Sequence, residues 1–213
     1  MSTQSALTTE PATVPSTPEN PFLAGNPASV GLPAFVVGSI ALGLTLVGYV
    51  PATAGAAPIA IIAAATAMGL IIATIWAAAI GQSAVASIFG IFSGFWLSYA
   101  ALVLGLTNNW FGIPAEAAVK TQGLFLISWL VIIVMLTLGT LRLPLAFSVL
   151  FALIDVALLA VLIGTLSGSS GWLKLGGVVV LLFAAVGVYL YLGVAAAATG
   201  GKALPLGGPV QRS

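Results

Sequence analysis

The chain of 213 residues contains no cysteine and no histidine, and only 4% of its residues are charged. Without cysteine it has no disulfide, thiolate metal ligand or Cys nucleophile, and without histidine it cannot assemble a Ser-His-Asp triad or a His-rich metal site. After residue 25 its acids are Glu116, in an expected loop, and Asp155, in an expected membrane span. A paired-carboxylate mechanism is therefore not expected. We predict a protein that is not an enzyme and holds no cofactor and no metal.

The few charges also limit the partners of the protein. Five basic and four acidic residues give a net charge of +1, which indicates neither nucleic acid nor an acidic surface as a partner. An ordinary soluble domain has about 25% charged residues, whereas this chain is 61% hydrophobic with a mean hydropathy of +1.23. So few charges cannot cover a water-soluble fold, and the chain is predicted to be an integral membrane protein in contact with the lipid bilayer.

Six apolar runs follow a polar N-terminal segment. Residues 1–25 are rich in Ser, Thr and Pro and lack the basic and apolar regions of a signal peptide, so a disordered tail is expected there. Residues 26–201 are expected to form an all-α membrane domain, a compact bundle of six transmembrane helices, and residues 202–213 a C-terminal tail. Continuous rather than alternating runs favour helices over a β-barrel. The expected spans are 31–50, 58–80, 84–106, 121–141, 145–166 and 172–199.

The basic residues favour one orientation by a small margin. With the N-terminus inside, Arg142, Lys202 and Arg212 are cytoplasmic, while Lys120 and Lys174 are outside. We therefore expect both termini in the cytoplasm. The absence of a signal peptide and the size of the chain favour the plasma (cell inner) membrane of a prokaryote, with the protein as a multi-pass component.

Helical stripes of small and of aromatic residues predict how the spans pack. Small residues recur every four positions from Ala65 to Gly81 in the second span and from Ala86 to Ser98 in the third. Such stripes let helix backbones approach closely, within one chain or between subunits. On the other side of the third span an aromatic stripe indicates either bundle core or the lining of a pore. Its members are Phe89, Phe92, Trp96 and Tyr99.

Asp155 is the one ionisable residue deep in an expected span. Insertion of an Asp at a helix centre costs roughly 2.5–3.5 kcal/mol, and such residues usually face a cavity that carries protons or solutes. We hypothesise that Asp155 faces the transport path and titrates during transport, as a candidate proton-coupling residue. The alternative is a protonated Asp that is hydrogen-bonded to a neighbouring helix.

The stretch NPASVGLPAF, residues 26–35, opens the first span. Asn26 can cap a helix start, with Pro27 at the first helical position where its missing N–H costs nothing. Gly31 and Pro33 are expected to allow a further bend before the span proper. Such a start is either a simple interfacial cap or a means of aiming free N–H groups and the Asn26 amide at an entering anion.

This stretch resembles the Asn-Pro-Ala-Pro-Leu-Gly-Leu signature of the succinate–acetate permease family, also called YaaH-type acetate uptake transporters. The similarity continues in order through SGFWLS, LGTLR, VLFAL, GWLKLGG, VYLYLG and KALPLG, over nearly everything after residue 25. The resemblance implies a six-helix permease for acetate and related short carboxylates that moves them with protons. It also implies a channel-like form and assembly as a homo-oligomer, a hexamer, in which each subunit has its own pore.

The resemblance further implies a hydrophobic pore constriction. In the family it consists of an aromatic residue shortly after the signature, an aromatic residue in the third span and an aliphatic residue in the fifth. These positions fall on Phe35, Phe92 and Ile154 of this chain, with Asp155 beside the last of them. The chain departs from the family in the signature, where Ser-Val replaces Pro-Leu, and at Phe92, where a Tyr is familiar. Asp155 stands where a small hydroxyl residue would be expected.

A candidate path and two alternatives follow from these residues. Substrate entry and binding are assigned to Asn26, Pro27, Gly31, Ser87 and Ser93. Because the chain offers no buried Lys or Arg to fix an anion, a pore for a neutral small solute such as ammonia or water is one alternative. A non-transporting membrane scaffold or sensor is the other. A dry, fully packed bundle would favour the scaffold, and a continuous wettable path would favour transport.

Overall fold

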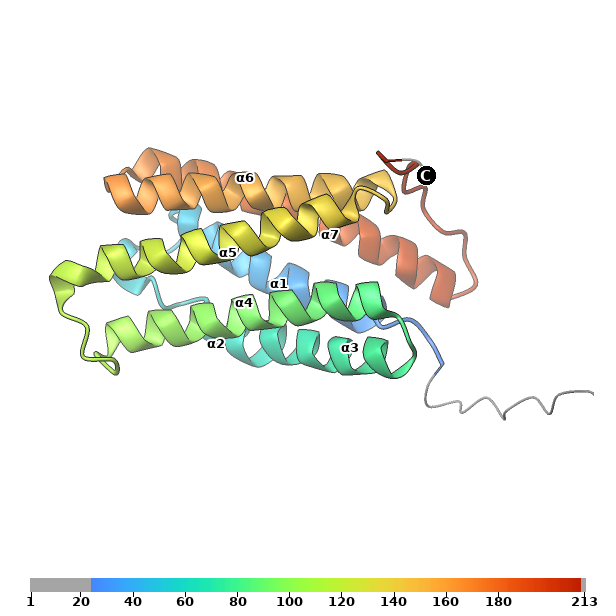
Figure 1. Cartoon of the computed structure of the whole chain (residues 1–213), viewed down its shortest axis with the longest axis horizontal. Coiled ribbons are helices and arrows are strands. Elements are labelled where there is room, and N and C mark those ends of the chain that lie inside the picture. The colour runs from blue at the N-terminus through green and yellow to red at the C-terminus, as the bar shows by residue number, and fades with distance from the viewer. Residues whose placement is uncertain (1–23, 212–213) are drawn as a thin grey trace, which may run out of the picture.

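A computed structural model describes residues 24–211 of the chain, and within that range the fold is helical apart from one isolated bridge between Pro144 and Pro209 (Figure 1). Most of the expected N-terminal tail, residues 1–23, lies outside the described residues, as do residues 212–213. The helices are α1 (Ala28–Val47), η2 (Ala52–Ala54), α2 (Ile59–Ile61), η3 (Ile62–Ala67), α3 (Met68–Ala79), α4 (Ser83–Thr107), η4 (Ala115–Ala117), α5 (Ala118–Thr140), α6 (Leu145–Ser167) and α7 (Ser170–Ala198).

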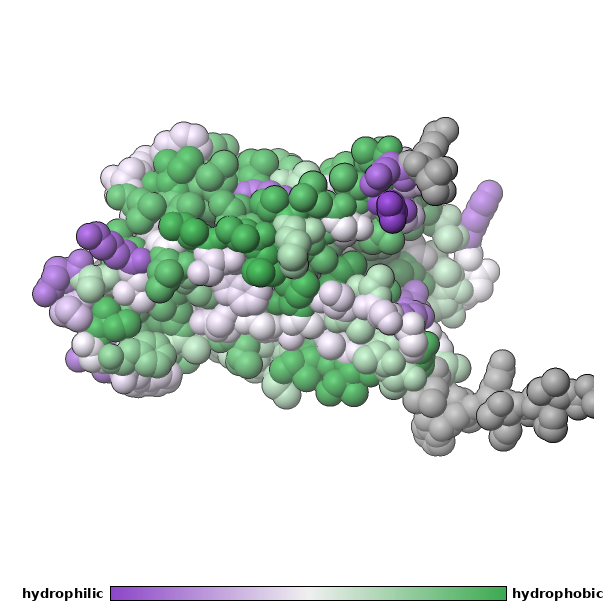
Figure 2. Space-filling view, in the orientation of Figure 1, coloured by the Kyte–Doolittle hydropathy of each residue, from purple (hydrophilic) through white to green (hydrophobic). Residues whose placement is uncertain are grey.

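Six helical segments within residues 24–211 are long and apolar enough to cross a membrane. The pieces from η2 to α3 count as one segment, Ala52–Ala79, and η4 continues into α5 to give Ala115–Thr140. The six segments have 20 to 29 residues, and roughly 20 are needed to cross the hydrocarbon core as a helix. Figure 2 shows apolar side chains over most of the visible side of the bundle, with hydrophilic ones gathered mainly at its two ends. The predicted all-α fold with six spans is confirmed.

The start of the first span differs from the prediction. We expected a bend at Pro33 and a span that begins near residue 31. Instead α1 begins at Ala28 and runs through Pro33 without interruption. A proline within a helix removes the hydrogen bond from its own nitrogen to the carbonyl four residues earlier, here that of Ser29. Pro33 is the sixth residue of α1, past the first turn, in which N–H groups lack partners in any case. The helix continues in spite of this loss, so the separate turn that we expected before the span is not found.

α1 lies in the middle of the bundle, with α7 on one side and α3 and η3 on the other (Figure 1). Glycines make both approaches close. A Cβ atom at Gly177 of α7 would lie 2.7 Å from the Cβ of Leu46 and 2.9 Å from the backbone nitrogen of Val47. On the other side, Gly38 of α1 leaves no room for a Cβ beside Thr66 of the π-helical turn η3. Small residues therefore allow the backbone contacts on which helix association in lipid depends.

The predicted stripe of small residues in the second span is only partly buried. Ala73 and Ala77 are fully buried, whereas Ala65 and Gly81 are exposed. A π turn accommodates one residue more than an α turn, so it shifts the positions before it around the helix axis. The part of the segment before α3 is instead buried through Ile62, Thr66 and Ala67.

The position of the site is given relative to the two ends of the bundle. At the end that we call the α1 end, α1, α4 and α6 begin; at the α7 end, α5 and α7 begin (Figure 1). The chain after α7 folds back over the α1 end, where the Ala146 N–H donates to the Leu206 carbonyl at 3.0 Å. The Tyr189 hydroxyl donates to the Pro205 carbonyl at 2.6 Å. The expected C-terminal tail is thus, as far as residue 211, attached to α6 and α7.

Candidate functional site

A cavity of about 630 Å³ extends from the α7 end to the middle of the bundle. Residues of α1, α4, α5, α6 and α7 line it, together with the segment around η2. Its mouth includes the exposed residues Thr53 and Thr107, and its inner end includes the buried side chains of Phe35, Phe92 and Ile154. The scaffold alternative would require a bundle that is packed throughout, and this bundle is not.

A second cavity, of about 80 Å³, lies toward the α1 end. Its lining is entirely apolar and comes from the first turns of α1, α4 and α6. Phe35 and Phe92 line both cavities. Their ring centroids are 5.1 Å apart in an edge-to-face arrangement, and the residues are 5% and 4% exposed. The two rings thus separate the larger cavity from the smaller one.

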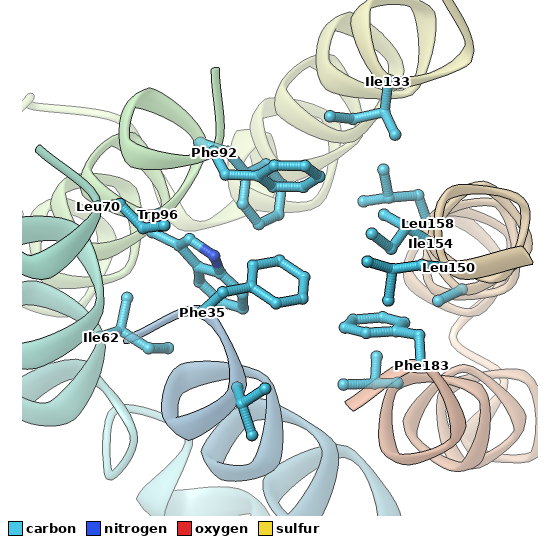
Figure 3. Close-up of a cluster of buried hydrophobic side chains, with 14 of the residues drawn as sticks. Phe35, Ile62, Leu70, Phe92, Trp96, Ile133, Leu150, Ile154, Leu158 and Phe183 are labelled. Carbon is cyan, nitrogen blue, oxygen red and sulfur yellow. The ribbon is translucent and has the colours of Figure 1, made fainter. Parts of the chain in front are cut away.

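Ile154 adds an aliphatic side chain to this layer from α6. It lines the larger cavity and is 5% exposed. Figure 3 shows Phe35 and Phe92 on one side and Ile154 and Phe183 on the other, around a central gap. The three residues that the family resemblance assigned to a constriction therefore lie together at the inner end of the larger cavity. We call Phe35, Phe92 and Ile154 the central layer.

Two further phenylalanines pack against the central layer, and neither was predicted from the sequence. The ring of Phe183, from α7, lies 5.7 Å from that of Phe35, and the ring of Phe151, from α6, stacks on Phe92 at 5.8 Å. Phe151 precedes Ile154 by three residues, so their shared helix face was a signal that could have found it. Phe183 stands in a continuous apolar run that gives no such signal.

The aromatic stripe of the third span, for which core and pore lining were both open, lines the two cavities. Phe92, Trp96 and Tyr99 line the larger cavity, and Phe89 and Phe92 line the smaller one. The stripe follows one face of α4 past the central layer, so a solute that crossed the bundle along these cavities would meet aromatic rings on both sides of that layer.

Asn26 caps the start of α1 beside the smaller cavity. Its Oδ1 accepts the Ala28 N–H at 3.0 Å, and its backbone carbonyl accepts the N–H and the hydroxyl of Ser29 at 3.0 and 2.8 Å. Pro27 is fully buried. Asn26 itself is exposed and lines neither cavity, whereas Ala28 lines the smaller one. The local geometry is that of the interfacial cap.

Gly31 lets α4 approach α1. A Cβ atom at Gly31 would overlap the ring of Phe89, which lines the smaller cavity. Gly31 therefore allows Phe89 to reach its place in the wall, while Gly31 is not itself among the lining residues.

Ser87 and Ser93 line neither cavity. Ser87 is exposed, and the Ser93 hydroxyl donates to the Gly90 carbonyl of its own helix at 2.8 Å. Consecutive helix positions point about 100° apart. Because Phe92 faces the cavities, its neighbour Ser93 is turned away from them. The two serines therefore line neither of the two cavities, and their assignment to the path stays a prediction.

Asp155 faces α5 rather than a cavity. The Thr137 hydroxyl oxygen lies 2.7 Å from Asp155 Oδ2 and 2.9 Å from the Ile133 carbonyl. The other carboxyl oxygen, Oδ1, is enclosed and has no hydrogen-bond partner within residues 24–211. Ile154 takes the cavity-facing position of this helical turn, so Asp155 points elsewhere. In this structure Asp155 has a hydrogen bond to the neighbouring helix and lines neither of the two cavities, and its role in transport stays a prediction.

A membrane bundle with two cavities on either side of an apolar layer has the architecture of a channel or permease. The chain belongs to the GPR1/FUN34/yaaH family, whose model matches residues 8–202. This match confirms the family resemblance inferred from the sequence.

Three fungal relatives are similar to this chain. The Meiotically up-regulated gene 86 protein of Schizosaccharomyces pombe is 33% identical over 69% of this chain and 49% of its own length. Acetate permease A of Emericella nidulans is 29% identical over 65% of this chain and 49% of its own length. The Accumulation of dyads protein 2 of Saccharomyces cerevisiae is 29% identical over 80% of this chain and 61% of its own length. The chain thus spans about half the length of the first two relatives.

A solved structure shares the fold. The structure of the bacterial acetate channel SatP matches with a TM-score of 0.76 and 25% sequence identity, over 86% of this chain and 99% of that chain. The activities named among these matches are those of a permease and a channel, and neither is enzymatic, in agreement with the sequence prediction.

Proposed function

We propose that this chain is a membrane permease or channel for acetate and related short-chain carboxylates, succinate included, and that it moves them together with protons. The observation that carries the proposal is the pair of cavities, one toward each end of the bundle, that share Phe35 and Phe92 of the central layer in their walls. The names of the acetate permease and of the acetate channel that the chain resembles support acetate as the solute.

The apolar central layer is the reason to propose proton coupling. The ideal cost of moving a carboxylate from water into an apolar medium is on the order of 20 kcal/mol, and several kcal/mol persist after relaxation. A neutral hydroxyl group costs roughly 2–7 kcal/mol. The basic side chains within residues 24–211 line neither cavity, so they offer no compensation to an anion at the layer. Crossing with a proton, as the acid, is therefore the route of lower free energy.

Phe35, Phe92 and Ile154 act as the pore constriction in this proposal. The Phe35 and Phe92 rings are in edge contact, so a solute passes only when the side chains move apart. Apolar constrictions of this kind gate by dewetting. A short carboxylic acid needs a smaller displacement of the rings than a long one, so the layer selects for short chains.

Asp155 keeps its role as a candidate proton-coupling residue, but through its helix. Its carboxyl group binds Thr137 of α5, while the preceding residue, Ile154, belongs to the central layer. The Thr137 hydroxyl has one proton and two acceptors within reach, Asp155 and the Ile133 carbonyl. When Asp155 is ionised, its carboxylate is the stronger acceptor for the Thr137 hydroxyl. When Asp155 is protonated, that hydroxyl can donate to the Ile133 carbonyl instead. The charge on Asp155 therefore affects the hydrogen bond that joins α5 and α6.

The proposal also covers the location, the orientation and the oligomeric state of the protein. The proposed location is the plasma membrane, with both termini in the cytoplasm. The count of basic residues in the sequence, three against two in favour of the side of the termini, supports this orientation. The described chain ends, 24 and 211, lie at the same end of the bundle (Figure 1). We also propose a homo-oligomer, a hexamer by family resemblance. Because both cavities form within one chain, each subunit would conduct through its own pore.

A pore for a neutral small solute, such as ammonia or water, is the second candidate. The lack of a basic side chain in the lining of either cavity favours it, because such a lining has no preference for anions. Stopped-flow measurements of water and ammonia permeability, on the same liposomes as the acetate measurements, separate the two candidates. Fast permeation of these solutes with no acetate uptake would select the neutral pore.

The test of the leading proposal is uptake of labelled acetate into liposomes that contain the purified protein, with and without a pH gradient that is acidic outside. Protein-free liposomes measure the acetic acid that crosses lipid unaided, and this rate is subtracted. We expect protein-dependent uptake that the gradient accelerates. If no protein-dependent uptake occurs under any gradient, the proposal fails.

The role of the central layer is tested with Phe92→Ala and the milder Phe92→Leu. The Ala variant removes the ring and costs about 3–5 kcal/mol of folding stability, whereas the Leu variant retains most of the apolar volume. Both are expected to raise the uptake of longer carboxylates relative to acetate. Phe111→Ala is the control, since Phe111 is exposed and lines neither cavity. Unaltered acetate flux and selectivity in both Phe92 variants would contradict the proposed constriction.

A further inference from the structure

The hydroxyl group nearest the central layer in the larger cavity is that of Tyr99. It follows Phe92 by seven residues on α4, about 10 Å along the helix axis. On α1 and α6 the first lining hydroxyls come ten and eleven residues after the layer, about 15 Å away. A solute that moves inward therefore meets Tyr99 last. The other polar side chains with hydroxyl or amide groups in the lining are Thr45, Thr53, Thr107, Gln122 and Thr165.

The Tyr99 ring is fixed by aromatic contacts, while its hydroxyl has no hydrogen-bond partner within residues 24–211. The ring stacks on Phe95 at a centroid distance of 6.4 Å and packs against Phe125 of α5 at 6.0 Å. Within residues 24–211 the hydroxyl has no hydrogen-bond partner, and it is not one of the enclosed atoms without a partner, as Trp96 Nε1 is. Tyr99 lines the cavity and its hydroxyl is not enclosed, so a solute in the cavity can reach it.

Gln122 presents a second polar side chain to the larger cavity, from α5. It precedes Phe125 by three residues, so the two share a face of α5, and Phe125 is the residue that touches the Tyr99 ring. Gln122 lines the same cavity, one helical turn nearer the mouth. Its amide is not among the enclosed polar groups without a partner in the part of the chain that the structure describes. A tyrosine hydroxyl and a glutamine amide each donate and accept hydrogen bonds.

We propose that Tyr99 and Gln122 form a binding site for the carboxyl group of a short, uncharged carboxylic acid, which exchanges its bonds to water for bonds to the protein before it enters the central layer. The inference rests on the transport function proposed above and assigns it two specificity-determining residues. A neutral carboxyl group donates and accepts, as the hydroxyl and the amide do. The basic residues within 24–211 are absent from the cavity lining, so a carboxylate would gain no ionic partner there.

The test compares Tyr99→Phe, which keeps the ring and removes only the hydroxyl, with the wild-type protein in liposomes. Initial rates are measured over a range of acetate concentrations. We expect the half-saturation concentration to rise about 2- to 12-fold, the factor for loss of one hydrogen bond of ordinary net strength. Gln122→Leu is expected to give a rise in the same range. Tyr191→Phe is the matched control, since Tyr191 lies in α7 and lines neither cavity.

Acetamide tests the charge of the bound form. It has nearly the shape of acetic acid and likewise donates and accepts, but it cannot ionise. We expect acetamide to inhibit acetate uptake by the wild-type protein and to inhibit it less in Tyr99→Phe. No inhibition of the wild-type protein would overturn the assignment to an uncharged acid.

The outcomes separate this inference from the function on which it rests. Wild-type uptake together with equal saturation curves for Tyr99→Phe and Tyr191→Phe would overturn the binding site and leave the transport function in place. A wild-type protein without acetate uptake would overturn both.

Discussion

The contact between α1 and α7 holds two rings of the site together, and a single methyl group should weaken it. α1 carries Phe35 and α7 carries Phe183, and their centroids are 5.7 Å apart. Nearer the α7 end, Gly177 brings α7 against the backbone of α1. The perturbation is therefore Gly177→Ala, which adds one carbon atom at the closest approach of the two helices.

The size of the effect follows from the distances at Gly177. The added Cβ would lie 2.7 Å from Leu46 Cβ, 2.9 Å from Val47 Cγ1 and 2.9 Å from the Val47 backbone nitrogen. Carbon atoms pack best at about 3.5–4.0 Å, so the helices must separate by several tenths of an ångström or more. Two of the three atoms cannot move without the backbone. Overpacking of this kind costs about 1–3 kcal/mol, partly offset by about 0.5–1 kcal/mol because Ala favours helix over Gly.

The assay is thermal unfolding of the purified protein in detergent. One kcal/mol corresponds to roughly 2–4 °C for a chain of this size, so Gly177→Ala should lower the Tm by a few degrees. Gly139→Ala is the control, because Gly139 lies inside α5 with nothing within 4 Å of the added Cβ. That variant should leave the Tm unchanged or raise it. A Tm of Gly177→Ala equal to or above that of Gly139→Ala would refute the reasoning.

Three further predictions concern local contacts. Asn26→Ala should lower the stability by about 0.5–2 kcal/mol through loss of the α1 cap, whereas Asn26→Ser should restore most of it, both measured by Tm. Thr137→Val should cost about 1–3 kcal/mol because it leaves the Asp155 carboxyl without its partner, and Asp155→Asn should shift the pH dependence of acetate uptake; identical rates at every pH would remove Asp155 from the mechanism. Tyr189→Phe should expose the segment around Pro205 to proteases, and a digestion pattern like that of the wild type would contradict this.

The number of spans could be predicted from sequence because lipid restricts the fold. A membrane-spanning helix must satisfy its own backbone hydrogen bonds and be about 20 apolar residues long, and the chain shows six such runs with turn residues between them. Asn26 was identifiable as a cap for a similar reason, since an Asn before a Pro at a helix start has a known local geometry.

The direction in which each helix faces could not be predicted in the same way. α6 is apolar on nearly all sides, so its sequence does not reveal which face meets the cavity, and Asp155 was assigned to the path although Ile154 occupies that face. The sequence of α7 is also apolar and likewise does not reveal that Phe183 faces the cavity. The aromatic stripe of α4 was visible, but periodicity alone does not distinguish core from cavity lining. The return of the chain to Leu206 rests on backbone hydrogen bonds that leave no pattern in the sequence.

The absence of cysteine from the chain allows a direct test of the path through the larger cavity. Ala157→Cys places one thiol a turn beyond Ile154 in the cavity wall, and Tyr49→Cys places one at a highly exposed loop position that lines neither cavity. Each variant is treated in detergent with a small thiol-reactive reagent, reconstituted, and assayed for labelled acetate uptake. If acetate crosses through this cavity, modification at Ala157→Cys should abolish uptake, and modification at Tyr49→Cys should leave it intact. Full uptake by the modified Ala157→Cys protein, with modification verified by mass, would contradict the path.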